Sequence, residues 1–142
     1  MMKDGTRKYI SNVDAQIYII KINGKIIPIV KAEPGKENCY VCSPYSQYID
    51  YSIVELKTLN FFPLEVALKL LLKSMGVFFK WTNFNNVVYV NNWFLSTNLY
   101  LKLSQKEIAC INELLEITFP GDIIIYRSLN SYTSEKLMID LE

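Results

Sequence analysis

One stretch in the second half of the chain constrains the fold most, because it places two apolar runs on either side of a capped helix. Residues 87–91 are β-branched and aromatic, and residues 122–127 carry three consecutive isoleucines, as buried strands do. Between them, Ser104 and Glu107 form a capping box, and Pro120-Gly121 ends the helix. The stretch therefore predicts two parallel strands joined through a helix.

A β-hairpin is predicted over residues 16–31. Its two apolar runs are joined by Asn23-Gly24, the dipeptide best suited to a type I′ turn, because both central positions of that turn need a positive φ. Pro28 has no N–H to donate to a neighbouring strand. The second strand should therefore have an unpaired side at Pro28 or lie at an edge of the sheet.

Two helices are predicted between the hairpin and the strand at 87–91. The first, over residues 44–59, follows Ser43-Pro44, which suits an N-cap and a first helical position. The second begins at Pro63, and Gly76 is expected to end it.

The second helix has a single narrow polar stripe. Glu65, Lys69 and Lys73 are spaced by four residues, and nearly all the other side chains are apolar. We expect the sheet and the neighbouring helix to bury most of this helix, and the alternative is that its apolar surface contacts a partner. Its three charges argue against a membrane span.

The whole pattern predicts an α/β fold: one domain over residues 1–142, with a mixed sheet, an N-terminal hairpin and a βαβ unit flanked by helices. Residues 1–14 are polar and are expected to be poorly ordered at the start. A last helix near 133–142 stops after about two and a half turns, so we expect the chain to be the N-terminal part of a longer protein.

The composition excludes several chemistries. The chain has no histidine, the commonest general base and metal ligand, and three cysteines cannot complete a zinc site alone, so no metal is predicted. Fifteen basic and fourteen acidic residues, without a basic run, favour neither nucleic acid nor an anionic membrane as a partner. The odd cysteine count and the lack of a signal-peptide pattern indicate a reducing, cytoplasmic location.

Cys39-Tyr-Val-Cys42 has the C-x-x-C spacing of a redox pair. Such pairs usually lie where a strand passes into a helix N-terminus, with the attacking thiol exposed. Because residues 39–42 are predicted as a short strand that contains the first cysteine, we favour buried structural cysteines over a redox site.

A ligand pocket is predicted at the edge of the sheet where both parallel strands end, because the carboxyl ends of neighbouring parallel strands bind ligands in open α/β sheets. Arg127 is the natural anchor for a carboxylate or phosphate, with Trp93 and Tyr100 beside it. For Asn91 and Asn92, however, we favour a structural role, in which they end the strand and hydrogen-bond the next loop. The candidate pocket residues are Asn92, Ser96, Thr97, Asn98, Arg127, Ser128 and Asn130.

Three blocks of the sequence carry a family resemblance: residues 38–45 (N-C-Y-V-C-S-P-Y), 88–100 (V-Y-V-N-N-W-F-L-S-T-N-L-Y) and 119–130 (F-P-G-D-I-I-I-Y-R-S-L-N). They resemble, in this order, the amino-terminal half of a poorly characterised bacterial family of GNAT-like acyl-CoA N-acyltransferases. The resemblance implies a GNAT-like sheet and, for the full-length protein, acyl transfer from acyl-CoA to an amine. A tyrosine such as Tyr45 or Tyr48 is then a candidate to protonate the leaving thiolate.

The chain departs from that family at two points. The (R/Q)-x-x-G-x-(G/A) turn that cradles the pyrophosphate is missing from the sequence, and Asp122 stands where the family pattern has histidine. We therefore expect no cofactor within residues 1–142 and no more than weak binding of coenzyme A, while acyl-CoA is the cofactor implied for the full-length protein. The alternative function is a non-catalytic domain that binds a small molecule or another protein segment, such as the remainder of the parent chain.

Overall fold

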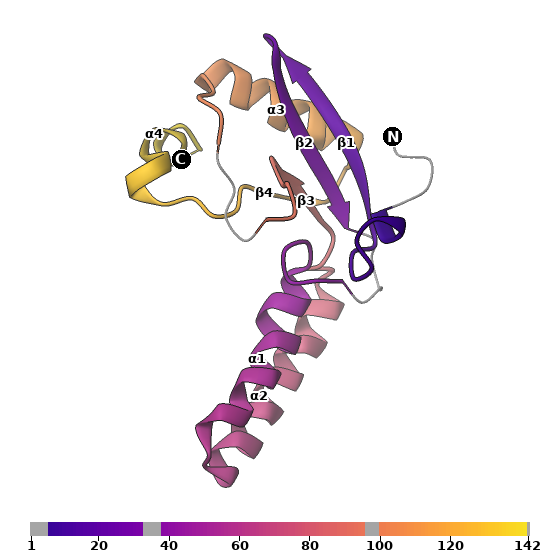
Figure 1. Cartoon of the computed structure of the whole chain (residues 1–142), viewed down its shortest axis with the longest axis vertical. Coiled ribbons are helices and arrows are strands. Elements are labelled where there is room, and N and C mark those ends of the chain that lie inside the picture. Colours follow the sequence, from indigo (N-terminus) through magenta and orange to yellow (C-terminus); the bar gives the residue numbers. More distant parts are fainter. Residues whose placement is uncertain (1–5, 33–37, 96–99, 142) are drawn as a thin grey trace.

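Four strands form one mixed sheet in the order β1-β2-β3-β4, with one pair of helices beside it and another projecting from it (Figure 1). The computed structural model describes residues 6–32, 38–95 and 100–141. The strands are β1 (Ala15–Ile22), β2 (Lys25–Ala32), β3 (Val87–Val90) and β4 (Ile123–Ile125). The helices are η1 (Thr6–Lys8), η2 (Ser46–Asp50), α1 (Tyr51–Glu55), η3 (Leu56–Leu59), α2 (Phe62–Trp81), α3 (Gln105–Thr118) and α4 (Ser131–Leu141). The α/β class and the mixed sheet are confirmed.

The predicted N-terminal hairpin is confirmed. Strands β1 and β2 are antiparallel, and Asn23 and Gly24 have φ values of 48° and 77°, as a type I′ turn requires. Pro28 lies opposite Ile19 of β1, and the ladder from β2 to β3 starts one residue later, at Ile29. The missing N–H of Pro28 therefore lies outside the pairing with β3, although β2 is a central strand.

The strand, helix, strand unit is also confirmed. Strands β3 and β4 are parallel, with Val87 opposite Ile123. Ile108, Ile111 and Leu115 of α3 are buried against the side chains of β2 and β3. Strand β4 was expected to be buried, but within the described part of the chain it pairs with β3 alone and lies at the edge of the sheet, where Ile123 is exposed.

The strand predicted at residues 39–42 is wrong: these residues form a turn, in which the Cys42 N–H donates to the Cys39 carbonyl at 3.1 Å. The backbone around the turn is held by partners outside any sheet. The Asn38 side chain accepts from the Asp14 N–H at 2.6 Å and donates to the Asp14 carbonyl at 3.0 Å, and the Cys39 N–H donates to Asn12. These side-chain and loop bonds replace the ladder that the β-rich composition predicts.

Residues 6–14 of the segment expected to be poorly ordered pack against the sheet, and residues 1–5 lie outside the described part of the chain. Thr6 is buried, and its hydroxyl donates to the carbonyl of Val13 or Ala15 and accepts from the Ala15 N–H. Val13 and Ala15 are themselves buried in the core.

The helical hairpin formed by η2, α1, η3 and α2 projects from the sheet (Figure 1). Its first arm covers the predicted helix at 44–59, and Asn60 ends this arm in the left-handed conformation, with φ 51°. Its second arm continues to Trp81, past the helix end predicted at Gly76. A Cβ added at Gly76 would lie 3.1 Å from the Tyr45 Oη and 3.4 Å from the Ile49 Cγ2, so this glycine allows close contact between the arms rather than ending a helix.

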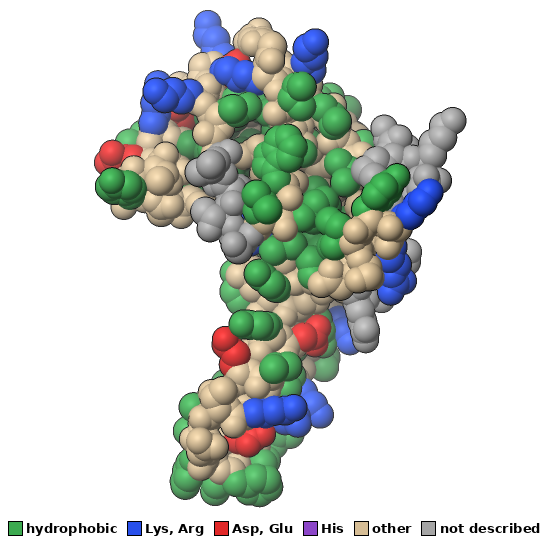
Figure 2. All heavy atoms as spheres, in the orientation of Figure 1, with side chains coloured by type: hydrophobic (Ala, Val, Ile, Leu, Met, Phe, Trp, Pro, Cys, Tyr) green, Lys and Arg blue, Asp and Glu red, His purple; other side chains and the backbone are tan. Residues whose placement is uncertain are grey.

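The expected burial of the second helix is wrong. Within α2, which is described throughout, only Gly76 is buried, and Phe62 and Trp81 are 76% and 79% exposed. One helical arm can cover only one side of α2, and the sheet lies beyond its base (Figure 1). Many apolar side chains of the projecting arms are therefore exposed, among charged and polar ones (Figure 2). An apolar surface of this extent is typical of a contact surface, the alternative given above. None of the helices in the described ranges has the length and apolarity needed to cross a membrane.

Glu107 joins the tip of the β1–β2 hairpin to the start of α3. Its carboxylate accepts from Lys25 Nζ at 2.7 Å and from Asn23 Nδ2 at 3.0 Å, and it completes the predicted capping box with Ser104. The Lys25 ammonium, with the Ser104 N–H and the Asn23 amide, lowers the pKa of Glu107 from 4.5 to about 2.

We predict that Glu107→Gln lowers the free energy of unfolding at pH 7 and that this loss shrinks as the pH falls. A lowered folded-state pKa means that the carboxylate stabilises the fold above pH 4.5 and loses that contribution as the pH falls toward 2. Urea denaturation at pH 7 and pH 3 measures the difference between variant and wild type. Glu113→Gln, at an exposed position of α3, is the control, and an unchanged Glu107→Gln effect at both pH values contradicts the assignment.

We predict that Gly76→Leu destabilises the protein by about 1–3 kcal/mol, because a larger side chain would separate the two arms of the hairpin. Ser74→Leu places the same side chain at an exposed position of α2 and should cost much less. Chemical denaturation followed by helical circular dichroism measures both. Equal effects at the two positions would show that the arms are not in close contact at Gly76.

A pocket at the base of the helical hairpin

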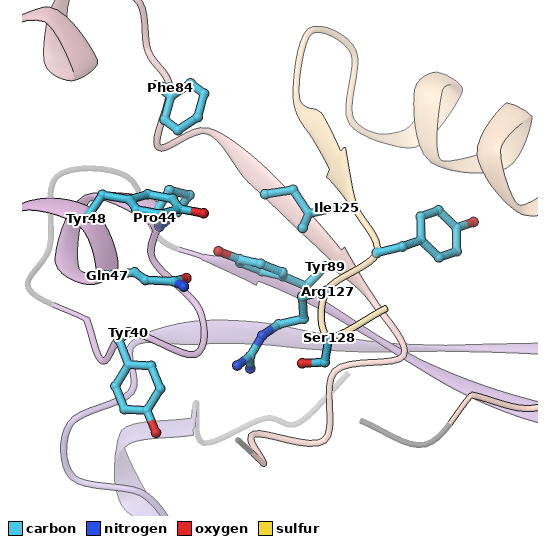
Figure 3. Close-up of a pocket in the computed structure, with 10 residues that line it drawn as sticks. Tyr40, Pro44, Gln47, Tyr48, Phe84, Tyr89, Ile125, Arg127 and Ser128 are labelled. Atoms are coloured by element: carbon cyan, nitrogen blue, oxygen red, sulfur yellow. The ribbon is translucent and has the colours of Figure 1, made fainter. Parts of the chain in front are cut away.

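A pocket of about 560 Å³ lies between the base of the helical hairpin and the end of strand β4 (Figure 3). Four parts of the chain contribute to it: the turn at 39–42, the start of the first helical arm, the β3 region, and the residues at the end of β4. Its lining residues are Tyr40, Pro44, Gln47, Tyr48, Phe84, Tyr89, Ile125, Tyr126, Arg127 and Ser128.

Arg127 lies at this pocket and within reach of the loop after β3, as predicted. Its Nη1 donates to the Val41 carbonyl at 3.2 Å and to the Leu95 carbonyl at 3.1 Å. Figure 3 shows the guanidinium extending between Tyr40 and Ser128. The nearest acid in sequence, Asp122, forms an ion pair with Lys31 of β2. The position of the guanidinium is therefore set by backbone carbonyls of two separate segments.

Asn92 has the structural role that we favoured for the asparagines. Its side chain is 1% exposed and lies outside the pocket lining. Its Nδ2 donates to the Val41 carbonyl at 2.8 Å, and its Oδ1 accepts from the Phe94 N–H at 2.9 Å. Asn92 and Arg127 thus bind the same carbonyl of the cysteine-containing turn.

The other predicted residues divide into three groups. Ser128 lines the pocket, and Ser96, Thr97 and Asn98 lie outside the described residues. Asn130 is not part of the lining, because its Oδ1 accepts from the N–H groups of Tyr132 and Thr133 at 3.1 and 2.9 Å and so caps α4. Of the predicted residues that the structure describes, Arg127 and Ser128 therefore line the pocket, whereas Asn92 and Asn130 do not.

Trp93 and Tyr100 do not line the pocket either. The Tyr100 hydroxyl donates to the Arg127 carbonyl at 2.8 Å, and its ring packs against the core. The Trp93 indole N–H donates to Asn91 Oδ1 at 3.0 Å. Tyr100 therefore supports the backbone at Arg127 from the core side.

Sequence reasoning missed most of the aromatic side chains that line the pocket: Tyr40, Phe84, Tyr89 and Tyr126. Tyr48 was considered only as a proton donor. Side chains alternate between the two faces of a strand. Val88 and Val90 pack with α3 on one face of the sheet, so the alternation could have predicted that Tyr89 lies on the other face. Burial raises the pKa of Tyr89 above its usual range and that of Tyr126 to about 12, so both phenols stay neutral at physiological pH.

The hairpin side of the pocket is fixed to the β3 region by Asn85. Its Oδ1 accepts from the Ser43 hydroxyl and the Tyr45 N–H, both at 3.1 Å. The Ser43 Oγ in turn accepts from the Ser46 N–H at 3.1 Å, as expected of an N-cap. These bonds position Pro44, Gln47 and Tyr48 across the pocket from Arg127.

The pocket has the chemistry of a binding site. Among its described lining residues, Arg127 alone is charged, and the polar groups that accompany it are phenols, the Gln47 amide and the Ser128 hydroxyl. Neither histidine nor a carboxylate belongs to this described lining. In the described ranges, no three metal-ligating side chains cluster.

Comparison with known proteins identifies no relative: no family model, no curated protein and no solved structure matches this chain. The function must therefore be argued from the pocket itself.

We predict that Asn92→Ala lowers the free energy of unfolding by about 1–3 kcal/mol, because it leaves a buried N–H and a buried carbonyl with one partner fewer each. Asn92→Asp keeps the shape and the acceptor for Phe94 but loses the donor to Val41. Thermal and urea denaturation should rank both variants below the wild type. Wild-type stability in both would contradict the structural role.

Proposed function

We propose that this domain binds a small organic anion in the pocket at the base of the helical hairpin, with Arg127 as the anchor for its carboxylate or phosphate. The observation that carries the proposal is the combination of one guanidinium with aromatic rings in a single described lining. A guanidinium offers five N–H donors in a planar fork that matches carboxylate and phosphate oxygens.

The size of the pocket favours a metabolite-sized ligand. Small-molecule sites commonly occupy about 300–1,000 Å³, and a volume of about 560 Å³ lies within that range. Tyr40 and Tyr48 are exposed at this site, so the ligand can enter directly from solvent.

The aromatic lining favours an anion with an apolar or planar body. Tyr40, Tyr48 and Tyr89 surround the space into which Arg127 extends, and Phe84 lies at its far side (Figure 3). Aromatic rings contribute large apolar contact areas and stack on planar groups. The Gln47 amide and the Ser128 hydroxyl then supply the few polar contacts that orient such a ligand.

The N-acyltransferase activity implied by the family resemblance is the second candidate. The observation in its favour is the parallel β3–β4 pair joined through α3, which fits the α/β sheet that the resemblance implies. The sequence offers no glycine turn to hold the pyrophosphate of coenzyme A. Calorimetric titration with acetyl-coenzyme A should therefore give no saturable heat, and a micromolar dissociation constant would favour acyl transfer over the non-catalytic proposal.

We predict that aromatic monocarboxylates and monophosphates, with benzoate and phenyl phosphate as first probes, raise the melting temperature, whereas the neutral isostere benzamide does not. Arg127→Met should weaken binding about 10- to 100-fold, because a charge-assisted hydrogen bond contributes about 1.5–3 kcal/mol. Thermal shift and calorimetry measure these effects.

Arg7→Met is the matched control, because it removes a guanidinium that pairs with Asp14 at the protein surface. It should bind the anions as the wild type does. The proposal fails if anions and their neutral isosteres stabilise the protein equally, or if the two arginine variants lose affinity to the same extent.

A further inference from the structure

Cys39 and Cys42 lie in a turn that leads directly into a helix. The helical arm starts at Pro44, immediately after its N-cap Ser43. We favoured structural cysteines because a strand was expected to contain Cys39. That strand does not form. Cys42 thus lies one residue and Cys39 four residues before the N-cap, close to a helix N-terminus, the setting in which redox pairs occur.

The two thiols are close enough to be joined. Their Sγ atoms are 3.6 Å apart. Residues at positions i and i+3 of a turn have Cα atoms less than about 7 Å apart, which overlaps the span of about 4.4–6.8 Å that disulfides accept. Side-chain rotation within the existing turn can therefore bring the sulfurs to bonding distance.

The thiols differ in exposure, as an attacking and a resolving cysteine must. Cys39 is half-buried, whereas Cys42 is fully buried. The Cys42 Sγ also lies 3.6 Å from Asn38 Oδ1 and 3.4 Å from the Cys39 carbonyl oxygen, so polar groups of the protein surround it. An external disulfide can reach Cys39 first, and Cys42 can act only afterwards, from within the protein.

The surroundings of Cys39 stabilise its thiolate. The hydrogen bond from the Cys42 thiol is the largest cause, and the N–H groups of Val41 and Cys42 and the charge of Arg127 add to it, so that the pKa of Cys39 falls to about 6 despite partial burial. The hydrogen bond with Cys39 and the burial of the thiol raise the pKa of Cys42. At neutral pH the reactive thiolate of the pair is thus on the more accessible residue.

We propose that Cys39 and Cys42 form a redox-active dithiol that undergoes exchange with small-molecule disulfides of the glutathione class. The Cys39 thiolate attacks one sulfur of the disulfide, forms a mixed disulfide and releases the first thiolate. Cys42 then loses its proton and attacks the Cys39 sulfur, which forms the Cys39–Cys42 bond and releases the second thiolate. Two protein thiols are oxidised and one small disulfide is reduced to two thiols. This inference does not depend on the ligand of the pocket.

The test uses the whole chain with Cys110→Ser, because Cys110 is exposed on α3 and would itself react. In mixtures of reduced and oxidised glutathione, this protein should convert reversibly to a form lacking two hydrogen atoms by mass, with Cys39 and Cys42 linked in peptide maps. Adding Cys42→Ser should trap a stable glutathione adduct on Cys39. Adding Cys39→Ser instead should remove both the adduct and the disulfide.

Circular dichroism and melting curves show whether each variant is folded, and Cys42→Ala replaces Cys42→Ser if the buried serine prevents folding. In the wild-type chain, which keeps Cys110, iodoacetamide should alkylate Cys39 about tenfold faster than Cys110 at neutral pH, because the lowered pKa of Cys39 increases its thiolate fraction. The proposal is overturned if the folded protein forms no Cys39–Cys42 disulfide in oxidised glutathione, or if a folded Cys42 variant accumulates no adduct on Cys39.

Discussion

The arrangement around the pocket depends on one backbone carbonyl, that of Val41, which accepts hydrogen bonds from the side chains that follow two strands. Asn92 follows β3 and donates at 2.8 Å, and Arg127 follows β4 and donates at 3.2 Å. Val41 belongs to the turn that precedes the helical hairpin. Both donors are therefore positioned by the sheet, and through one acceptor they fix where the hairpin begins. Buried polar groups of this kind are costly to separate, so the contact specifies a single arrangement.

That turn connects the two chemistries proposed for the chain. It presents Tyr40 to the pocket and places Cys39 and Cys42 within hydrogen-bonding distance of each other, and Arg127 bonds to its middle residue. Recognition of an anion and exchange of a disulfide would thus involve the same few residues. The exposed apolar side chains of α2 extend along the whole helix, from Phe62 at its start to Trp81 at its end.

Local signals in the sequence predicted the parts of the fold that local chemistry determines. Asn23-Gly24 specifies its turn, Ser104 and Glu107 specify the start of α3, and both features are present. The burial of α2 could not be predicted this way. Its sequence shows which side chains are apolar, but not whether another element covers them. Similarly, the residue type of Asn92 suits either a pocket or a loop, and only tertiary contacts decide. The aromatic lining was missed because its members come from segments far apart in the chain, whereas Arg127 was found because strand ends are predictable.

A double-mutant cycle between Asn92 and Arg127 tests this account most directly. The free energy of unfolding is measured for Asn92→Ala, Arg127→Met, the double variant and the wild type under the same conditions. Because both side chains donate to the Val41 carbonyl, the account predicts a coupling energy of about 0.5–3 kcal/mol between them. Additive effects, within about 0.5 kcal/mol, would show that the two residues act independently and that no shared contact joins the hairpin to the sheet.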